Sequence, residues 1–252
     1  MTDYNRALVT PQQNERSSPA LIFHDGQCML DMTTEGGTRV QKLISMEAVK
    51  AAAQGIPIDS GWLPLEGTGI VRWGNGVLDE WLVAYIAPKR HRLELIDTPG
   101  PDEIVEHVVA PLPGLVIFGG GCKYWIWAVK DEHLDPQHEI FRCPLPNVMQ
   151  DASICWGPLK PPQASPRAIM RAFGLFIGSS FNNHAANEKS KKFPEDCRLM
   201  LKDLADPAQS AEGPIHGPGL KYPVDDLTRQ TRDGISLDSA IRGFFETGGF
   251  PG

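Results

Sequence analysis

The chain has 252 residues, of which 41% are hydrophobic and 22% are charged. This composition is typical of a folded globular protein, and the length is sufficient for one large domain with a substantial core. The formal net charge of −7 argues against a nucleic-acid binder that depends on overall positive charge. We therefore expect no nucleic-acid partner.

Several features predict a cytoplasmic protein that does not enter a membrane. The apolar stretches Trp81–Ala87 and Val108–Phe118 are too short, or too broken by Pro111 and Pro113, to span a bilayer. The N-terminus lacks the basic-then-apolar pattern of an export signal. An odd number of cysteines without a CxxC pair favours a reducing compartment and offers no zinc-site spacing, so we expect no metal and no cofactor. The five cysteines are Cys28, Cys122, Cys143, Cys155 and Cys197.

The first part of the chain combines a polar lead-in with short predicted elements. Residues 1–19 are expected to form a flexible segment, because they are polar and contain proline. The runs Ala20–Phe23 and Gln27–Met32 flank an Asp-Gly step, which predicts a β-hairpin. The segment Ser45–Ala53 is predicted to be a short helix with a serine cap and a glycine soon after its end.

The region from Gly69 to Val129 is predicted to be mostly strand. Its runs are rich in β-branched and aromatic residues, and Gly, Pro or Asp steps separate them. The predicted strands are Gly69–Trp73, Glu80–Ile86, Arg92–Ile96, Leu115–Phe118 and Tyr124–Val129. Such closely spaced runs favour an antiparallel β-meander over alternating βαβ units. The glycine run 119–121 is predicted to be a hairpin turn and not a phosphate loop, because no helix follows it.

Helices are predicted in the C-terminal half. Ser165-Pro166 is a good start for the first, whose apolar face begins at Ile169, and a second is predicted from near Pro194, with Cys197 on its apolar stripe. We divide the chain into residues 1–19, a domain of 20–205 with a distinctive N-terminal part at 20–60, and a Gly/Pro-rich tail of 206–252. The tail contains one weakly amphipathic stretch, Leu237–Phe245. The basic runs 89–92 and 189–192 are most simply solvated loops, with docking of an acidic partner as an alternative.

The loop between the strands and the helices carries the strongest chemical signal. A Pro-Asn step at Pro146-Asn147 is followed eight residues later by Cys155. A reactive cysteine must be accessible and partly ionised, and its acyl adduct needs a donor for the developing oxyanion. Asn147 offers such an amide, or it could brace the loop. The alternative is that Cys155 is a small buried hydrophobe, as free cysteines commonly are.

This loop resembles the catalytic segment of ubiquitin-conjugating enzymes. The residues Leu145-Pro146-Asn147 and Ser153-Ile154-Cys155 are similar to the His-Pro-Asn and catalytic-cysteine pattern, with the same offset from Asn to Cys. More narrowly, the chain resembles the bacterial branch called prokaryotic ubiquitin-conjugating family D, typified by PRTRC system protein B. The segments 111–116, 124–128 and 180–184 also carry that resemblance. It implies an α+β fold of the ubiquitin-conjugating-enzyme type, in which a β-meander is followed by the cysteine loop and packed helices.

The resemblance also implies a function and two partners. Such enzymes accept a ubiquitin-like modifier protein as a thioester from a ThiF-related activating enzyme and pass it to an amine. Cys155 would be the thioester nucleophile, and Asn147 the oxyanion donor or loop brace. Leu145 stands where the general pattern has a histidine that holds the loop in shape. His184, in a polar loop after the first helix, is a candidate to assist proton transfer from the amine, or it is a surface histidine.

Two alternatives remain open at the level of sequence. The chain could be a non-catalytic scaffold of the same fold that binds the modifier or its activating enzyme, which the loss of the histidine at Leu145 favours. It could also be a thiol hydrolase that uses Cys155 with His184. That mechanism needs a third, orienting group, for which the sequence gives no clear candidate.

Overall fold

The computed structural model describes residues 20–24, 27–33, 37–45, 58–76, 79–97, 104–206, 215 and 220–247. The chain divides into two compact units, residues 1–56 and 57–252. The first unit contains a three-stranded antiparallel sheet of order β1-β2-β3, made of β1 (Ala20–His24), β2 (Gln27–Thr33) and β3 (Arg39–Ile44). The predicted hairpin between β1 and β2 is confirmed. The predicted helix at 45–53 and the predicted flexible segment 1–19 lie outside the described residues, except for Ser45.

The second unit is built on a six-stranded antiparallel sheet of order β11-β10-β9-β6-β5-β4. Its strands are β4 (Ile58–Asp59), β5 (Gly69–Gly76), β6 (Asp79–Ile86), β9 (Gly114–Gly120), β10 (Lys123–Val129) and β11 (Phe141–Arg142). The antiparallel pairing and the predicted hairpin turn after β9 are both confirmed. The α+β fold class predicted from the sequence is therefore correct.

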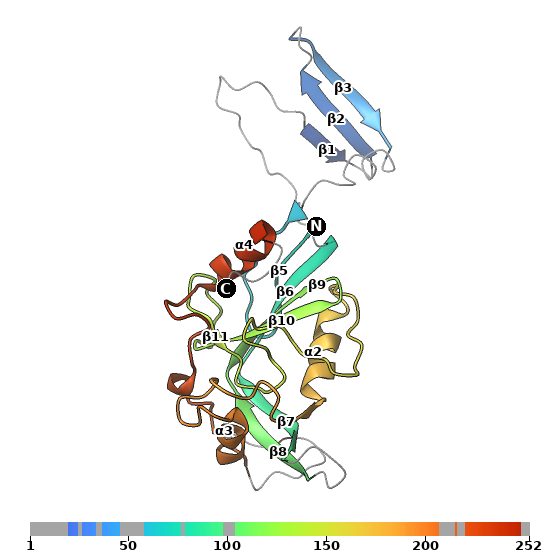
Figure 1. Cartoon of the computed structure of the whole chain (residues 1–252). Helices are drawn as coiled ribbons and strands as arrows, with labels where there is room; N and C mark the ends of the chain where they lie inside the picture. The colour runs from blue at the N-terminus through green and yellow to red at the C-terminus, as the bar shows by residue number, and fades with distance from the viewer. Residues whose placement is uncertain are drawn as a thin grey trace. The chain divides into compact units, whose positions relative to one another are not determined.

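The central strands are apolar at successive positions because both faces of the sheet are covered. In β6, Leu82 and Ala84 belong to one buried cluster, whereas Trp81 and Val83 belong to another. Successive side chains of a strand point to opposite faces. The first cluster contains residues of α2 (Ile169–Ile177), and the second contains residues of α4 (Leu237–Thr247). The two helices therefore cover opposite faces of the sheet (Figure 1).

One hairpin leaves the main sheet and interrupts the predicted meander. The strands β7 (Lys89–Ile96) and β8 (Val105–Leu112) pair with each other, and β12 (Ser180–Phe181) adds to β7 in parallel. Consequently β6 pairs with β9 and not with β7. The strand β8 was not predicted because Pro111 lies within it. Pro111 is tolerated in β8 because β8 is an edge strand, and no neighbouring strand needs a hydrogen bond from the outer side of this position.

The interpretation of residues 89–92 as a solvated loop is wrong. These residues begin β7, and the His91 side chain is buried against the ring of Phe173 on α2, with ring centroids 5.7 Å apart. The Arg90 guanidinium is also largely buried and bonds the Asp206 carboxylate at 2.9 Å. These basic residues therefore hold the hairpin to the rest of the unit.

Both predicted C-terminal helices are present, and each begins a few residues after its predicted first residue. The helix α2 begins at Ile169, after a turn in which the Ser165 carbonyl accepts bonds from two following N–H groups. The helix α3 (Cys197–Asp203) begins at its Asp196 cap and buries Cys197 as predicted. A short 3-10 helix, η1 (Val224–Asp226), follows.

The division after residue 56 lies close to the end of the expected N-terminal part, residues 20–60. Residues 20–45 contain a sheet within a separate unit, and residues 220–247 belong to the second unit together with the strands. The physical reason is that the weakly amphipathic stretch of the tail forms α4, whose apolar face completes a buried cluster.

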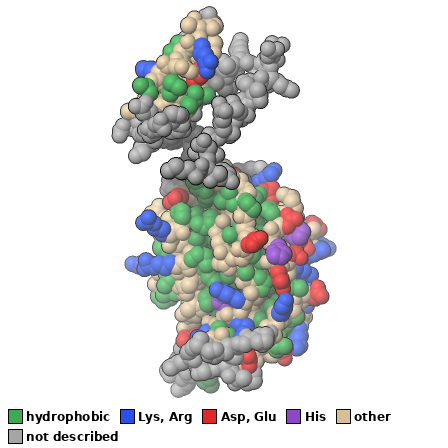
Figure 2. All heavy atoms as spheres, turned by 180° about the vertical axis from the view of Figure 1, so that it is seen from behind, with side chains coloured by type: hydrophobic (Ala, Val, Ile, Leu, Met, Phe, Trp, Pro, Cys, Tyr) green, Lys and Arg blue, Asp and Glu red, His purple; other side chains and the backbone are tan. Residues whose placement is uncertain are grey.

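The surface of the described residues carries both signs of charge. Basic and acidic side chains are interspersed on the face of the second unit in Figure 2. No helix in the described part of the chain has the length and apolar character needed to cross a membrane.

Candidate functional site

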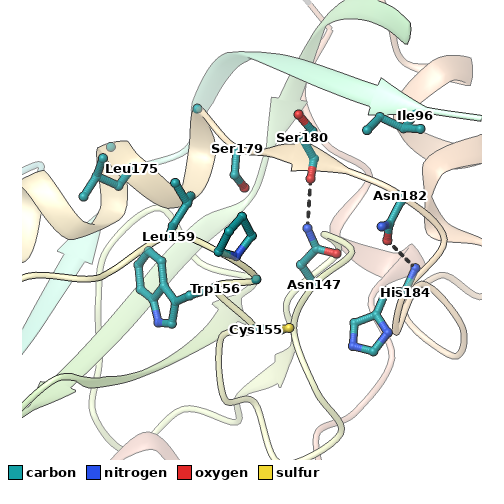
Figure 3. Close-up of a pocket in the computed structure, with 14 residues that line it drawn as sticks. Ile96, Asn147, Cys155, Trp156, Leu159, Leu175, Ser179, Ser180, Asn182 and His184 are labelled. Atoms are coloured by element: carbon teal, nitrogen blue, oxygen red, sulfur yellow. Dashed lines mark hydrogen bonds between the residues drawn. The ribbon is translucent and has the colours of Figure 1, made fainter. Parts of the chain in front are cut away.

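A cleft of about 640 Å³ contains all three candidate residues of the sequence analysis. Figure 3 shows Asn147, Cys155 and His184 around it, together with residues from the C-terminal end of α2 and the start of β12. Cys155 and Asn147 are partly exposed and His184 is exposed. Cys155 is thus accessible, and the alternative that it is a buried hydrophobe does not hold.

Main-chain hydrogen bonds join the three residues to one another. The Asn147 N–H donates to the His184 carbonyl at 2.9 Å, and the Cys155 N–H donates to the Asn147 carbonyl at 2.8 Å. Asn147 is therefore bonded directly to both of the other residues. Their proximity is fixed by the backbone and does not depend on a choice of side-chain rotamers.

Asn147 occupies a backbone conformation that few residues adopt. Its φ is +59°, in the left-handed region where Asn is tolerated far better than most residues with a side chain. Its side-chain nitrogen donates to the Ser180 carbonyl at 3.0 Å (Figure 3). An amide nitrogen carries two hydrogens, so this bond to the first residue of β12 leaves a second donor for another partner.

The cysteine loop is held against β10 by main-chain hydrogen bonds. The Ile154 N–H donates to the Tyr124 carbonyl, and the Ile126 N–H donates to the Ala152 carbonyl, both at 2.9 Å. Trp156 packs edge-on against Tyr124, with ring centroids 5.6 Å apart, and against Phe176 of α2. Cys155 therefore lies between two anchored neighbours and lines the cleft.

The three candidate residues of the cleft lie within the part of the chain that matches a known protein family. The family model of prokaryotic E2 family D matches residues 42–225. The chain belongs to prokaryotic E2 family D. E2 denotes the ubiquitin-conjugating class, so the match supports a ubiquitin-conjugating-like role in general. No curated protein and no solved structure matches the chain.

Within this family D chain, the residue in place of the motif histidine is part of the core. Leu145 is fully buried in the cluster that also contains α2. Its carbonyl oxygen, not its side chain, takes part in the loop's polar contacts, because it accepts a 2.6 Å bond from the Lys189 ammonium. Lys189 also donates to the Val148 carbonyl at 2.6 Å.

Lys189 is a functional candidate that the sequence did not indicate. The sequence predicts a solvated loop for the basic run 189–192, and this prediction is wrong for Lys189, which is 4% exposed. A lysine in a charged run is ordinarily a surface residue, so nothing in the sequence distinguished it from Lys191 and Lys192, which are exposed.

His184 sits at the rim of the cleft in the family D chain. The main-chain N–H of His184 donates to the Asn182 side-chain oxygen at 2.8 Å (Figure 3). This bond forms a local turn that stabilises the conformation of the loop. Among the described residues, its imidazole forms no hydrogen bond with the Cys155 thiol or with a carboxylate. A preformed cysteine–histidine–carboxylate arrangement is therefore absent from the part of the site that is described.

The remaining cysteines have structural surroundings, with one exception. Burial raises the pKa values of the Cys143 and Cys197 thiols to about 12, which keeps them protonated and inert. Cys28 is buried in the first unit, as expected. Cys122 was expected to pack but is exposed in the turn after β9. Within the described ranges, no group of three His, Cys, Asp or Glu residues could hold a metal ion.

Proposed function

We propose that this chain carries a ubiquitin-like modifier as a thioester on Cys155 and transfers it to an amine. The observation that carries the proposal is the convergence of Asn147, Cys155 and His184 at one cleft, through main-chain bonds of 2.8–2.9 Å. Membership of prokaryotic E2 family D supports the same class of reaction. The expected partners are the modifier protein and a ThiF-related activating enzyme that uses ATP.

The first step is an exchange of thioesters. The Cys155 thiolate attacks the carbonyl carbon at the modifier's C-terminus, a new C–S bond forms, and the thiolate of the activating enzyme leaves. In the second step an amine nitrogen attacks the same carbon, a C–N bond forms, the amine gives up a proton, and the Cys155 thiolate leaves. No oxidant, metal or nucleotide takes part in either step. A thiolate is a good leaving group, which keeps the bound acyl group reactive toward the amine.

Asn147 and His184 are assigned supporting roles in this mechanism. The second hydrogen of the Asn147 amide can stabilise the oxyanion that forms at the attacked carbonyl, and donors of this kind contribute about 2.7–4 kcal/mol to transition-state stabilisation. The His184 imidazole lies at the rim where an amine would enter and can accept its proton. Asn147 also braces the loop through its bond to Ser180.

The test is to incubate the protein with its modifier, activating enzyme and ATP, and to resolve the products without reductant. We expect an adduct that thiols remove and that Cys155→Ala abolishes, to below about one hundredth of the wild-type yield, since the variant has no nucleophile at the site. Cys122→Ala is the matched control, because Cys122 is a free thiol that is more exposed than Cys155. It should form the adduct at the wild-type rate.

Two other outcomes decide for the alternatives. A wild-type protein that binds the modifier but never forms the adduct would be a scaffold, and the thioester proposal would be wrong. Cleavage of a preformed modifier conjugate, dependent on Cys155 and His184, would identify a hydrolase. The missing hydrogen bond between these two side chains, within the described residues, argues against that outcome.

A further inference from the structure

A four-residue turn connects the core to the candidate site. It runs from Leu145, which is buried, through Pro146 and Asn147 to Val148, which is also buried. Pro at the second position and a left-handed Asn at the third are the residue preferences of a type II turn. The Asn147 carbonyl in this turn accepts the Cys155 N–H, so the shape of the turn determines where Cys155 lies.

The Lys189 side chain closes this turn from the inside. Its ammonium donates to the carbonyls of the first and last residues, Leu145 and Val148, at 2.6 Å each. A second attachment comes from the same segment, because the His184 carbonyl accepts the Asn147 N–H. The segment 184–189 therefore contacts the turn at its first, third and fourth residues.

Burial of this ammonium is energetically unfavourable. Desolvation is the main reason that the pKa of Lys189 is lowered to about 8; the Cys197 and Cys143 thiols oppose this shift, and the Arg142 guanidinium adds to it. The other titratable groups near it, Cys143 and Cys197, are thiols with raised pKa values and carry no negative charge at neutral pH. The two hydrogen bonds of the ammonium offset part of this cost, because they satisfy the carbonyls of the buried residues Leu145 and Val148. The bonds of the buried ammonium are therefore concentrated on one turn, whose shape they hold.

We propose that Lys189 is a positioning residue that holds the Leu145–Val148 turn, and through it Asn147 and Cys155, in the geometry needed for acyl transfer. Lys189 braces the turn from the segment 184–189. The buried apolar side chain of Leu145 cannot form such hydrogen bonds. The proposal rests on the proposed function for its effect on rate, but its effect on the turn is independent of that function.

The test compares Lys189→Met with Lys191→Met in the full chain. Lys191 is a matched control, because its ammonium also bonds a main-chain carbonyl, that of Asp225 at 2.7 Å, but on the exposed surface. We expect Lys189→Met to raise the hydrogen-exchange rates of the Asn147 and Cys155 amides at least tenfold. The melting temperature should fall, because two buried carbonyls lose their donor, and the rise in exchange at Asn147 and Cys155 should be at least tenfold larger than that of the β6 and β9 amides. Lys191→Met should change none of these.

A kinetic measurement separates positioning from binding. In single-turnover formation of the Cys155 thioester, Lys189→Met should lower the maximal rate at least tenfold, while the concentration of charged activating enzyme that gives half the rate should stay within twofold. If wild type forms no thioester but the exchange result holds, the proposed function is wrong and the positioning role stands. Unchanged exchange at Asn147 and Cys155 in Lys189→Met would overturn the positioning role.

A second measurement on the wild-type protein covers the case in which Lys189→Met does not fold. Loss of the ammonium charge weakens its bonds to the two carbonyls. We therefore expect the exchange rate of the Cys155 amide, divided by that of the β6 and β9 amides, to rise at least threefold between pH 7 and pH 9. The neighbouring thiols Cys143 and Cys197 stay protonated over this range. A flat ratio would contradict the proposal.

Discussion

At the scale of single residues, the site depends on a main-chain conformation that a side chain makes possible. Asn147 combines a left-handed φ with an amide that bonds Ser180 and with two main-chain bonds to the other candidate residues. Its backbone and its side chain therefore perform separate tasks. Two substitutions can distinguish them.

Asn147→Gly keeps the backbone conformation and removes the amide. Because Gly adopts positive φ readily, we expect the free energy of unfolding to fall by only about 1 kcal/mol, the value of one hydrogen bond. The rate of thioester transfer to an amine should fall by about 10²-fold or more if the amide stabilises the oxyanion. Urea unfolding and single-turnover aminolysis measure the two effects.

Asn147→Ala serves as the comparison for the backbone. It should be less stable than Asn147→Gly by about 1–2 kcal/mol, because an alanine at positive φ is strained. Equal stabilities for the two variants would mean that the turn relaxes to another conformation. A Gly variant with the wild-type aminolysis rate would leave Asn147 with no role in stabilising the oxyanion.

At the scale of elements, the hairpin of β7 and β8 is joined to α2 by a buried histidine. His91 is 8% exposed and packs edge-on against Phe173, with an angle of 81° between the rings. Burial, with a smaller contribution from the Lys89 charge, lowers the pKa of His91 to about 4. The contact therefore requires the neutral imidazole.

This pKa shift predicts a loss of stability in acid. The unfolded chain binds the His91 proton with an ordinary pKa near 6.5, whereas the folded protein resists it down to about pH 4. Stability from this group is therefore complete above pH 6.5 and lost as the pH falls toward 4. The variant His91→Phe keeps a packed ring but cannot titrate. Between pH 7 and pH 5 its free energy of unfolding should fall by roughly 2 kcal/mol less than that of the wild type. Urea unfolding at both pH values measures this difference. Equal losses of unfolding free energy in the two proteins would show that burial does not lower the pKa of His91.

At the scale of the whole second unit, the last described helix completes the structure. The helix α4 covers the face of the sheet opposite α2, and its Asp238 accepts bonds from the Trp62 indole at 2.7 Å and the Arg72 guanidinium at 3.1 Å. It lies beyond residue 225, where the family match ends. The residues of α4 are nevertheless part of the core of this unit.

A core substitution in α4 tests this role. Ile241 is fully buried, so Ile241→Ala should lower the free energy of unfolding by about 2–5 kcal/mol, through lost apolar contact and the cavity left behind. The adjacent Arg242→Ala removes the exposed partner of the buried Asp238, which keeps its bonds to Trp62 and Arg72, and should cost less than about 1 kcal/mol. Denaturant unfolding followed by tryptophan fluorescence measures both. Similar small losses would mean that α4 is not integral to the unit.

Much of the second unit could be predicted from local sequence. The strands β5, β6, β9 and β10, the faces of α2 and α3, and the amphipathic stretch of α4 follow from residue pattern and turn residues. The strand β8 could not be predicted in this way. Proline is unfavourable in a strand except at a sheet edge, and the local sequence does not show that β8 lies at an edge. The departure of β7 and β8 from the main sheet also depends on pairings between residues far apart in sequence.

The sequence by itself determined the fold class, the family and the loop in which a thiol follows Asn147 by eight residues. These features are local: they depend on residue type, spacing and turn preference. Only the tertiary structure decided that Lys189, forty-four residues after Leu145, is buried against that loop. The physical reason is that a lysine ammonium can be hydrogen-bonded by water or by carbonyl oxygens. The packing of segments distant in sequence decides whether carbonyl oxygens, and which ones, replace the water molecules around it.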